Sequence, residues 1–317
     1  NNDHRVEKLR SMGAEIFIGN IFSPIDLNKS MTDVSCAYFC PPWHPHMLQS
    51  AVLFAVAAKE AKVKGIVALS QWLASPMHPS HATRQNWLME EFFKMIPGIS
   101  TVIVNPGFFA DNYMALMPFA AHFGIFPMPI GNSRNAPPSN EDIARVIVSA
   151  LIDIEQFAGQ TFRPTGPSLL TAKDMALVFS KILNRRVFAI DMPMFMFFKA
   201  MRVMEIPAFQ QIGVRQYVRD HLAGSFEVGA PNDHVKKLTG LEPESFEVIA
   251  ARYARFPDAQ RNVQSFLKAF WLFTRIGFTP AFNLDELEIE QDHPILSSSQ
   301  LAIESDIWKK TRAGGFE

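Results

Sequence analysis

Short apolar runs and helix-spaced apolar positions alternate along the first hundred residues of this chain. Residues 101–104 contain no alternating polar position, which predicts a strand covered on both faces. Similar runs at residues 14–19, 34–40 and 65–70 predict three more strands. Residues 47–62 carry small and apolar side chains at helical spacing. This order of strand, helix and strand predicts a parallel sheet with right-handed crossovers.

Local signals for the ends of helices support the same arrangement. Ser23 and Pro24 are a typical N-cap and first helical residue, and they predict a helix to residue 31. Residues 3–12 form a polar helical segment that Gly13 can end. Another helix is predicted at residues 84–95.

The second half of the chain is predicted to be mostly helical. We therefore expect an α/β protein in which residues 1–150 form the sheet domain and residues 151–317 form a smaller, mostly helical C-terminal cap region. The predicted helices are 115–126, 140–151, 171–183, 193–204, 207–223 and 242–256, and the predicted short strands are 161–163 and 186–190.

Composition excludes some classes of function. Hydrophobic residues make up 48% and charged residues 19%, as in globular proteins, and the net charge of −1 argues against an electrostatic nucleic-acid binder. No uncharged apolar run reaches the ~18 residues of a membrane-spanning helix. Cys36 and Cys40 would lie about 13 Å apart on one strand, too far for a mutual disulfide. We therefore expect a reducing, cytoplasmic location.

The carboxyl ends of the predicted strands meet at one edge of the sheet, which is where ligands bind in open α/β sheets. Chemistry-bearing residues follow three of the strands. They are Pro41, Pro42 and Trp43 after the first, Ser70 and Gln71 after the second, and Asn105, Pro106, Gly107, Phe108, Phe109, Asp111 and Asn112 after the third.

Several segments, in this order and spacing, resemble the NmrA-like branch of the atypical short-chain dehydrogenase/reductases. The segments are LRSMGAEIFIGN (9–20), the strand ending at Pro41–Pro42, AAKEAKVKGIVALS (57–70), VNPGFFADN (104–112), DIARVIVSAL (142–151) and TFRPTGPSLLTAKDMA (161–176). The resemblance implies a Rossmann-like parallel sheet, NAD or NADP as cofactor, and a small-molecule substrate.

The chain departs from this family in one respect that matters for the cofactor. The family begins with a strand, a glycine-rich turn and a helix that cradle the pyrophosphate, and no G-x-x-G-x-x-G occurs here. We therefore expect the Rossmann-like sheet to be N-terminally incomplete and the natural protein to carry roughly 30 further residues upstream. Without the turn, a third interpretation is that the chain binds no nucleotide.

The resemblance also implies roles for individual residues, each with a structural alternative. The implied cofactor contacts are Asn20, Pro41, Pro42, Trp43, Ser70, Asn105, Pro106, Gly107 and Phe108, and the implied substrate pocket is Phe109, Asn112 and Tyr113. The alternatives are a turn at Asn20, a strand stop at Pro41–Pro42, and packing between sheet and cap for the aromatic residues.

Ser70 matches the family's serine at a strand end, which would polarise a carbonyl. The partner motif Tyr-x-x-x-Lys is absent, because Asn86 stands at the lysine position and Ala82 four residues before it. His81 is the remaining candidate proton donor. Hydride transfer to a quinone-like acceptor needs no dedicated tyrosine, since the cofactor carries the redox chemistry.

Four histidines follow neighbouring predicted strands: His44, His46, His78 and His81. Imidazoles that converge can bind a metal, but no carboxylate or cysteine accompanies them, so we predict solvated loops and no metal site.

Two apolar stretches have more than one interpretation. Residues 192–204 are rich in Met and Phe and predict core or a dimer contact, with a substrate wall as the alternative. Residues 266–278 place Lys268 and Arg275 on one face of an apolar helix, which suits packing against the cap or, alternatively, a membrane surface or partner.

Two functions remain open at this point. One is an NAD(P)H-dependent oxidoreductase for a small apolar carbonyl or quinone-like acceptor, favoured by the Phe- and Met-rich mouth of the site. The other is a non-catalytic NAD(P) redox sensor that acts through a protein partner, favoured by the missing Tyr-x-x-x-Lys. A homodimer is compatible with both.

Overall fold

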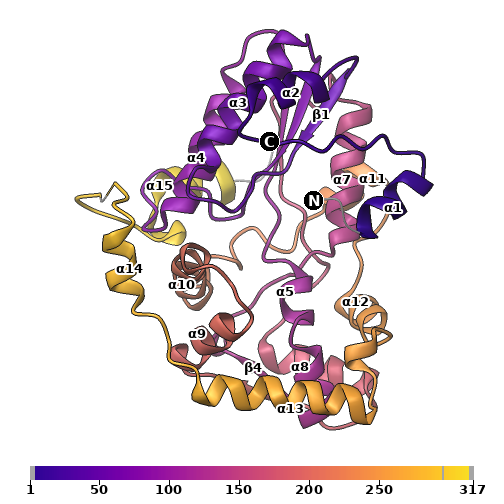
Figure 1. Cartoon of the computed structure of the whole chain (residues 1–317), viewed down its shortest axis with the longest axis vertical. Helices are drawn as coiled ribbons and strands as arrows, with labels where there is room; N and C mark the ends of the chain where they lie inside the picture. Colours follow the sequence, from indigo (N-terminus) through magenta and orange to yellow (C-terminus); the bar gives the residue numbers. More distant parts are fainter. Residues whose placement is uncertain (1–3, 295, 314–317) are drawn as a thin grey trace.

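A four-stranded parallel sheet occupies the upper half of Figure 1, in a computed structural model that describes residues 4–294 and 296–313. The strand order is β1-β2-β3-β5, with every neighbouring pair parallel. The strands are β1 (Cys36–Phe39), β2 (Gly65–Leu69), β3 (Ser100–Val104) and β5 (Thr161–Phe162). The predicted α/β class and parallel sheet are confirmed.

Helices cover both faces of this sheet. Helices α3 (Met47–Glu60) and α4 (His81–Lys94) pack on one face, against strand residues such as Ile66 and Ile103. Helix α7 (Asn140–Ile152) packs on the other face, against Val67, Val102 and Val104. Because neighbouring residues of β2 and β3 are buried on opposite faces, these strands carry no polar alternation.

The N-terminal segment confirms two predicted helices and corrects one predicted strand. Helices α1 (His4–Ser11) and α2 (Pro24–Ser30) form, and the Ser23 side chain caps α2 by accepting from the Asp26 N–H. Residues 14–19 form no strand, and most of them are exposed. A strand needs a neighbour for its N–H and C=O groups, and among the described residues β1 pairs only with β2.

The predicted helix at residues 115–126 is wrong at its last three residues. Helix α6 (Met117–Phe123) ends at Gly124, which has a left-handed φ of 67°. A short strand follows, β4 (Ile125–Met128), and it pairs in parallel with β6 (Phe188–Asp191). A Cβ on Gly124 would lie 2.7 Å from the Arg186 carbonyl oxygen, so glycine permits both the turn and this close approach.

The rest of the chain is mostly helical, as predicted. Helix α10 lies between the sheet and the lower half of the molecule, and α13 runs along the lower end (Figure 1). Among the described residues, no helix is long and apolar enough to cross a membrane, and Cys36 and Cys40 are unpaired. The helices are α5 (Ala110–Met114), α8 (Ala172–Ile182), α9 (Met194–Val203), α10 (Ala208–Leu222), α11 (His234–Thr239), α12 (Phe246–Tyr253), α13 (Val263–Phe278), α14 (Leu284–Glu290) and α15 (Asp306–Trp308).

The contact between β2 and the end of α7 allows a direct test of this packing. A Cβ on Gly65 would lie 2.2 Å from Cγ1 of Ile154, so Gly65→Ala should lower the free energy of unfolding by about 1–3 kcal/mol in urea titrations. Ile154→Ala removes the clashing atoms and opens a cavity. The double variant should therefore be more stable than the sum of the two single changes predicts, by about 0.5–3 kcal/mol. Strict additivity would contradict this packing.

Candidate functional site

The carboxyl ends of β2 and β3 are joined by a buried carboxylate from α4. The Ser70 hydroxyl donates to Oε1 of Glu90, and the Asn105 amide nitrogen donates to the same oxygen at 2.8 Å. The second N–H of the Asn105 amide donates to the Gln71 carbonyl oxygen at 2.9 Å. Ser70, Glu90 and Asn105 are all buried. These bonds fix the side chains that follow both strands.

The same contacts leave one buried acceptor without a partner. Both amide hydrogens of Asn105 are used, so the assignment of its nitrogen and oxygen follows from the contacts. Its Oδ1 is buried and accepts no hydrogen bond from any described residue. An unsatisfied buried polar atom costs about 1–3 kcal/mol. A donor group on a bound molecule, such as a carboxamide N–H, would satisfy it.

Trp43 connects the end of β1 with helix α10. Its ring packs on Gly213, where a Cβ would lie 2.9 Å from the indole, and near Tyr217, with 6.3 Å between ring centroids. The Gln210 side chain donates to the Trp43 carbonyl oxygen at 3.2 Å. Pro41 and Pro42 are half-buried and Trp43 is 43% exposed, so solvent reaches the residues that follow β1.

Phe108, which follows β3, lies in an aromatic cluster that the cap completes. Its ring is within 6.2 Å, between centroids, of Tyr113, Tyr217, His221 and Phe226. Tyr217 and His221 both belong to α10, one turn apart. The cap thus supplies most of the aromatic wall beside the end of β3.

A chain of hydrogen bonds at the edge of this cluster fixes the proton on His221. The Ser133 hydroxyl donates to the Ile130 carbonyl at 2.5 Å, so it accepts from Nδ1–H of His221 at 2.6 Å. Nε2 of His221 then accepts from the Tyr113 hydroxyl at 2.9 Å, and that hydroxyl accepts from the Asn135 amide at 3.2 Å. Burial lowers the pKa of His221 to about 4 and raises that of Tyr113. The imidazole is therefore neutral at pH 7.

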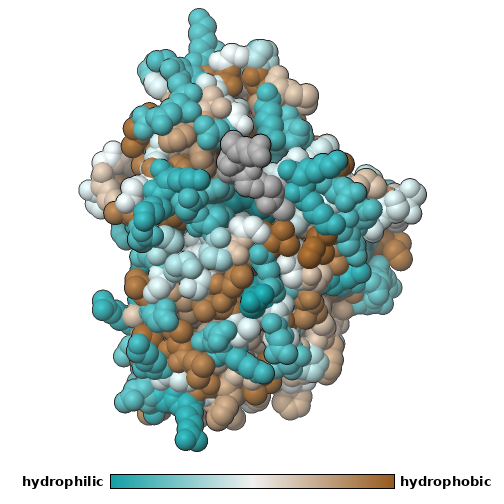
Figure 2. Space-filling view, turned by 180° about the vertical axis from the view of Figure 1, so that it is seen from behind, coloured by the Kyte–Doolittle hydropathy of each residue, from teal (hydrophilic) through white to brown (hydrophobic). Residues whose placement is uncertain are grey.

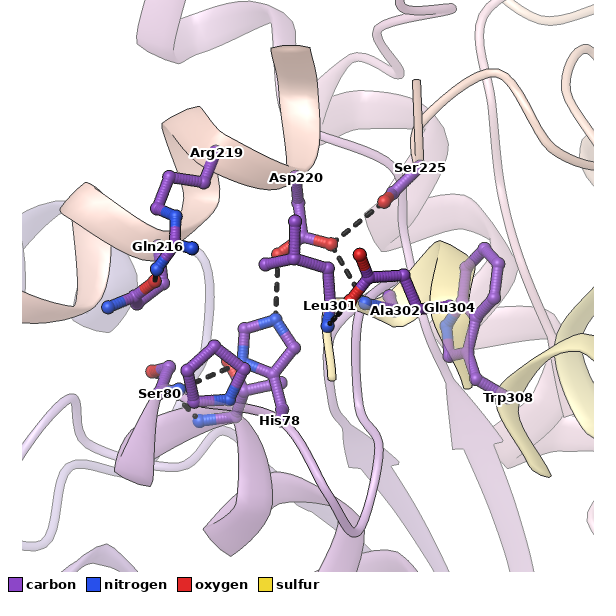
Figure 3. Close-up of polar contacts among 12 residues, drawn as sticks. His78, Ser80, Gln216, Arg219, Asp220, Ser225, Leu301, Ala302, Glu304 and Trp308 are labelled. Atoms are coloured by element: carbon purple, nitrogen blue, oxygen red, sulfur yellow. Dashed lines mark hydrogen bonds and ion pairs between the residues drawn. The ribbon is translucent and has the colours of Figure 1, made fainter. Parts of the chain in front are cut away.

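The neighbouring residue, Asp220, anchors a second polar cluster, shown in Figure 3. Its Oδ2 lies 2.7 Å from Nε2 of His78, in the loop after β2, and both side chains are fully buried. Its Oδ1 accepts from the Ser225 hydroxyl at 2.8 Å and from the Ala302 N–H at 3.0 Å. The Ser80 N–H donates to Nδ1 of His78 at 3.0 Å, so Nε2 carries the proton toward Asp220.

Two tryptophans and an arginine close the sheet edge at β5. The guanidinium carbon of Arg163 lies 3.4 Å from the ring centroid of Trp72 and 5.5 Å from that of Trp308. The indole N–H of Trp308 donates to the Trp72 carbonyl oxygen at 2.9 Å. The C-terminal segment thus covers residues that follow β2 and β5.

Other residues proposed from the sequence are engaged elsewhere. The side chain of Asn20 accepts from the Phe22 N–H at 2.9 Å in a local turn. His81 stacks on His293, with ring centroids 4.2 Å apart, and burial lowers its pKa to about 4, helped by the nearby charges of His293 and Arg84. Phe109 is the residue that precedes α5, and Asn112 is exposed.

The four histidines considered as metal ligands do not converge. His78 is bound to Asp220 and His81 stacks on His293, whereas His44 and His46 contact each other at 5.3 Å between centroids. Within the described part of the chain, no group of three or more His, Cys, Asp or Glu side chains could hold a metal.

One surface hollow is lined by other residues than these. It has a volume of about 520 Å³ and lies beside α13, where it is lined by Ala121, His122, Arg185, Arg261, Asn262, Val263 and Phe266. It contains none of the strand-end residues, so its size does not make it the candidate site.

Sequence reasoning missed Glu90, Arg163 and His221. A signal existed for Glu90, because it falls at a buried position of α4 together with Thr83 and Phe93. Its acidic side chain at a core position could have indicated a buried polar cluster. No sequence signal placed Arg163 or His221, whose partners lie far along the chain.

Comparisons with known proteins agree with this fold. No family model matches the chain. An NAD(P)H azoreductase of Xenophilus azovorans is 26% identical over 255 residues, which cover 79% of this chain and 86% of that protein. An NADPH-dependent quinone oxidoreductase from Escherichia coli, solved with NADPH, superposes with a TM-score of 0.67 at 17% identity, over 79% of this chain and 87% of that one. The transcriptional regulator NmrA in complex with NAD gives 0.63 at 16% identity, over 79% and 84%.

The buried His221 gives a prediction for stability against pH. Its pKa is about 4 when folded and ordinarily 6.5, so the unfolded chain binds a proton that the folded chain refuses as pH falls from 6.5 to 4. The contribution to stability is complete above pH 6.5 and falls by about 3 kcal/mol by pH 4. In His221→Gln this group is absent, so the unfolding free energy should fall less steeply between pH 6.5 and 4. The difference in slope should correspond to about one fewer proton taken up on unfolding.

Tyr113→Phe is the matched control for this measurement. It breaks the same hydrogen bond to Nε2 but leaves the imidazole in place, so it should lower stability and keep the pH dependence. His81 and His234 also have pKa values lowered to about 4 and contribute to the slope of every variant. Equal slopes in wild type and His221→Gln would show that His221 does not titrate in this way.

Proposed function

We propose that this chain, an NmrA-like protein of the atypical short-chain dehydrogenase/reductase fold, binds NAD(P)H and reduces a small apolar acceptor of the quinone or azo class. The observation that carries the proposal is the buried Oδ1 of Asn105, which lacks a donor at the carboxyl end of β3. The names of the azoreductase and the quinone oxidoreductase supply the class of acceptor.

The residues present fit the nicotinamide half of such a cofactor. Asn105 offers an acceptor for a carboxamide N–H, and Ser70 and Glu90 hold the Asn105 side chain in place. Trp43 and Phe108, which both lie near Tyr217 of α10, provide apolar walls. The printed sequence contains no glycine-rich turn for the pyrophosphate half.

A bound reduced nicotinamide would supply a hydride. The chain's own residues would orient the acceptor, through Phe108 and Tyr113. Asn86 donates its side-chain amide to the Ala82 carbonyl at 2.9 Å, and neither residue can act as an acid. A quinone or azo acceptor suits this site, because the proton that completes its reduction can come from solvent.

A redox sensor is the second candidate. The absence of the Tyr-x-x-x-Lys pair favours it, and so does the structural similarity to the regulator NmrA, solved with NAD. In this function the dinucleotide is bound but not consumed, and a protein partner reads its redox state. The two functions predict different results in one pair of assays.

Loss of the Asn105 acceptor should weaken cofactor binding. We expect Asn105→Leu to lower the affinity for NAD(P)H by roughly tenfold to a hundredfold in calorimetric titrations, the equivalent of one buried hydrogen bond. Glu90→Gln keeps Oδ1 of Asn105 in place and should retain more affinity. Asn132→Leu, on an exposed side chain outside the site, is the matched control and should bind as the wild type does.

Turnover separates the two candidates. The reductase would be supported if the wild type consumes NAD(P)H with a quinone or an azo dye and Asn105→Leu loses both this activity and cofactor binding. Binding without turnover, with different affinities for the oxidised and reduced dinucleotide, would support the sensor. No binding of either dinucleotide by the folded wild type would overturn both.

A further inference from the structure

Helix α13 packs on the protein through one face. Ser265, Ala269 and Ile276 are buried, and they recur at the spacing of one helical face. This face contacts α6 and α9. Beside it, Phe266 and Phe273 pack on Phe123 of α6, with ring centroids 5.9 Å and 5.6 Å away.

Five other apolar side chains of α13 lie on the opposite, outer face. At about 100° per residue, they form one continuous strip along the helix. Their exposed fractions are 75% for Val263, 57% for Leu267, 49% for Phe270, 66% for Trp271 and 91% for Phe278. Figure 1 places α13 along the lower end of the molecule, and Figure 2, seen from behind, shows that the lower half of the opposite face also carries hydrophobic side chains.

Positive charge borders this strip. Lys268 and Arg275, seven residues apart, lie on one edge of the helix, and residues 263–278 contain no acidic side chain. At the other end, Lys199 of α9 lies 5.9 Å from the ring centroid of the exposed Phe195 and donates to the Gly277 carbonyl at 3.5 Å. Lys268 makes only an exposed ion pair with Asp258, which is worth little in water.

The shape of the strip favours a flat, fluid partner over a second protein. A helix of 16 residues is about 24 Å long, and a strip about 10 Å wide along it covers roughly 240 Å². A stable protein–protein interface buries about 800 Å² on each partner. Trp and Phe side chains beside Lys and Arg are the composition that places a helix at the boundary between lipid headgroups and acyl chains.

We propose that α13 docks this protein on an anionic phospholipid bilayer. The outer strip enters the headgroup boundary, Lys268 and Arg275 face anionic headgroups, and the rest of the protein stays in water. The proposed attachment is peripheral, because α13 would enter the lipid with one face only and keep its inner contacts with α6 and α9. The dinucleotide site proposed above lies at the sheet edge, away from α13, so the two surfaces can be occupied together.

Vesicle co-sedimentation tests the proposal. We expect the wild-type chain to bind vesicles of about 3:1 phosphatidylcholine to phosphatidylserine, and to bind pure phosphatidylcholine vesicles more weakly. Its affinity for the anionic vesicles should fall as the salt concentration is raised. Leu267→Ser/Trp271→Ser should lower partition into the anionic vesicles by roughly tenfold or more. Lys268→Gln/Arg275→Gln should lower it severalfold at low salt and much less at high salt.

Matched controls remove similar groups from other faces. Ile152→Ser/Leu177→Ser changes two exposed apolar side chains, 73% and 67% exposed, on α7 and α8, and Lys29→Gln/Lys59→Gln removes two exposed positive charges from α2 and α3. Both should bind as the wild type does, with circular dichroism confirming the fold of every variant.

Several outcomes would overturn the proposal. The first is no binding to anionic vesicles at low salt, and the second is equal binding by the α13 variants and their controls. The third is a wild-type chain that binds no vesicles and forms a dimer in analytical ultracentrifugation, which Leu267→Ser/Trp271→Ser converts to a monomer. The last result would assign the strip to a second copy of the chain. None of these results bears on dinucleotide binding, which is measured without lipid.

Discussion

A carboxylate inside a protein is tolerated only when its oxygens accept hydrogen bonds. Asp220 meets this requirement by joining its own helix, α10, to three other segments. It binds the loop after β2 through His78, the turn after α10 through Ser225, and the C-terminal segment through Ala302. Removing one partner leaves a buried charge short of donors. The position of α10 over the sheet edge is therefore fixed by the satisfaction of one side chain, and not only by apolar packing.

The adjacent residue extends the same constraint into the cap. His221 follows Asp220 on α10 and bonds Tyr113 and Ser133, so the end of α10 is held by polar partners on two sides. Tyr217, one turn earlier, contacts both Trp43 and Phe108. Any displacement of α10 must break these contacts together. At the sheet edge, Trp72, Arg163 and Trp308 pack together on the β5 side, whereas Trp43 on the β1 side is exposed.

The sequence predicted the sheet well and its surroundings less well, for physical reasons. Strands buried on both faces are visible as continuous apolar runs, so β2 and β3 were predicted within one or two residues. Residues 14–19 have the same pattern, but a strand also needs a neighbour, which local pattern does not supply. The sequence predicts helix for the first two residues of β4 because they continue the apolar stretch of α6, and only the left-handed Gly124 separates them.

The candidate site shows the same division. Strand-end residues such as Ser70 and Asn105 could be placed at one edge from topology alone, because parallel strands share that edge. Their functional surroundings depend on pairs such as His78 with Asp220, 142 residues apart, and Tyr113 with His221, 108 residues apart. Such pairs are set by how the cap folds back on the sheet, which no local spacing encodes.

Helix α13 illustrates what apolar periodicity can and cannot determine. Its pattern correctly indicates that several large side chains share a face, and packing against the cap was the expected reason. That packing is confirmed for one side of the helix, where Ser265, Ala269 and Ile276 are buried and Phe266 and Phe273 contact Phe123 of α6. The other side exposes its large apolar side chains to solvent. Periodicity identifies which residues lie together, but it does not determine whether a neighbour covers each face. An exposed apolar face costs free energy in water. The helix keeps this face exposed because its inner contacts hold it in place, and burial of the outer face is a source of hydrophobic free energy that the fold has not used.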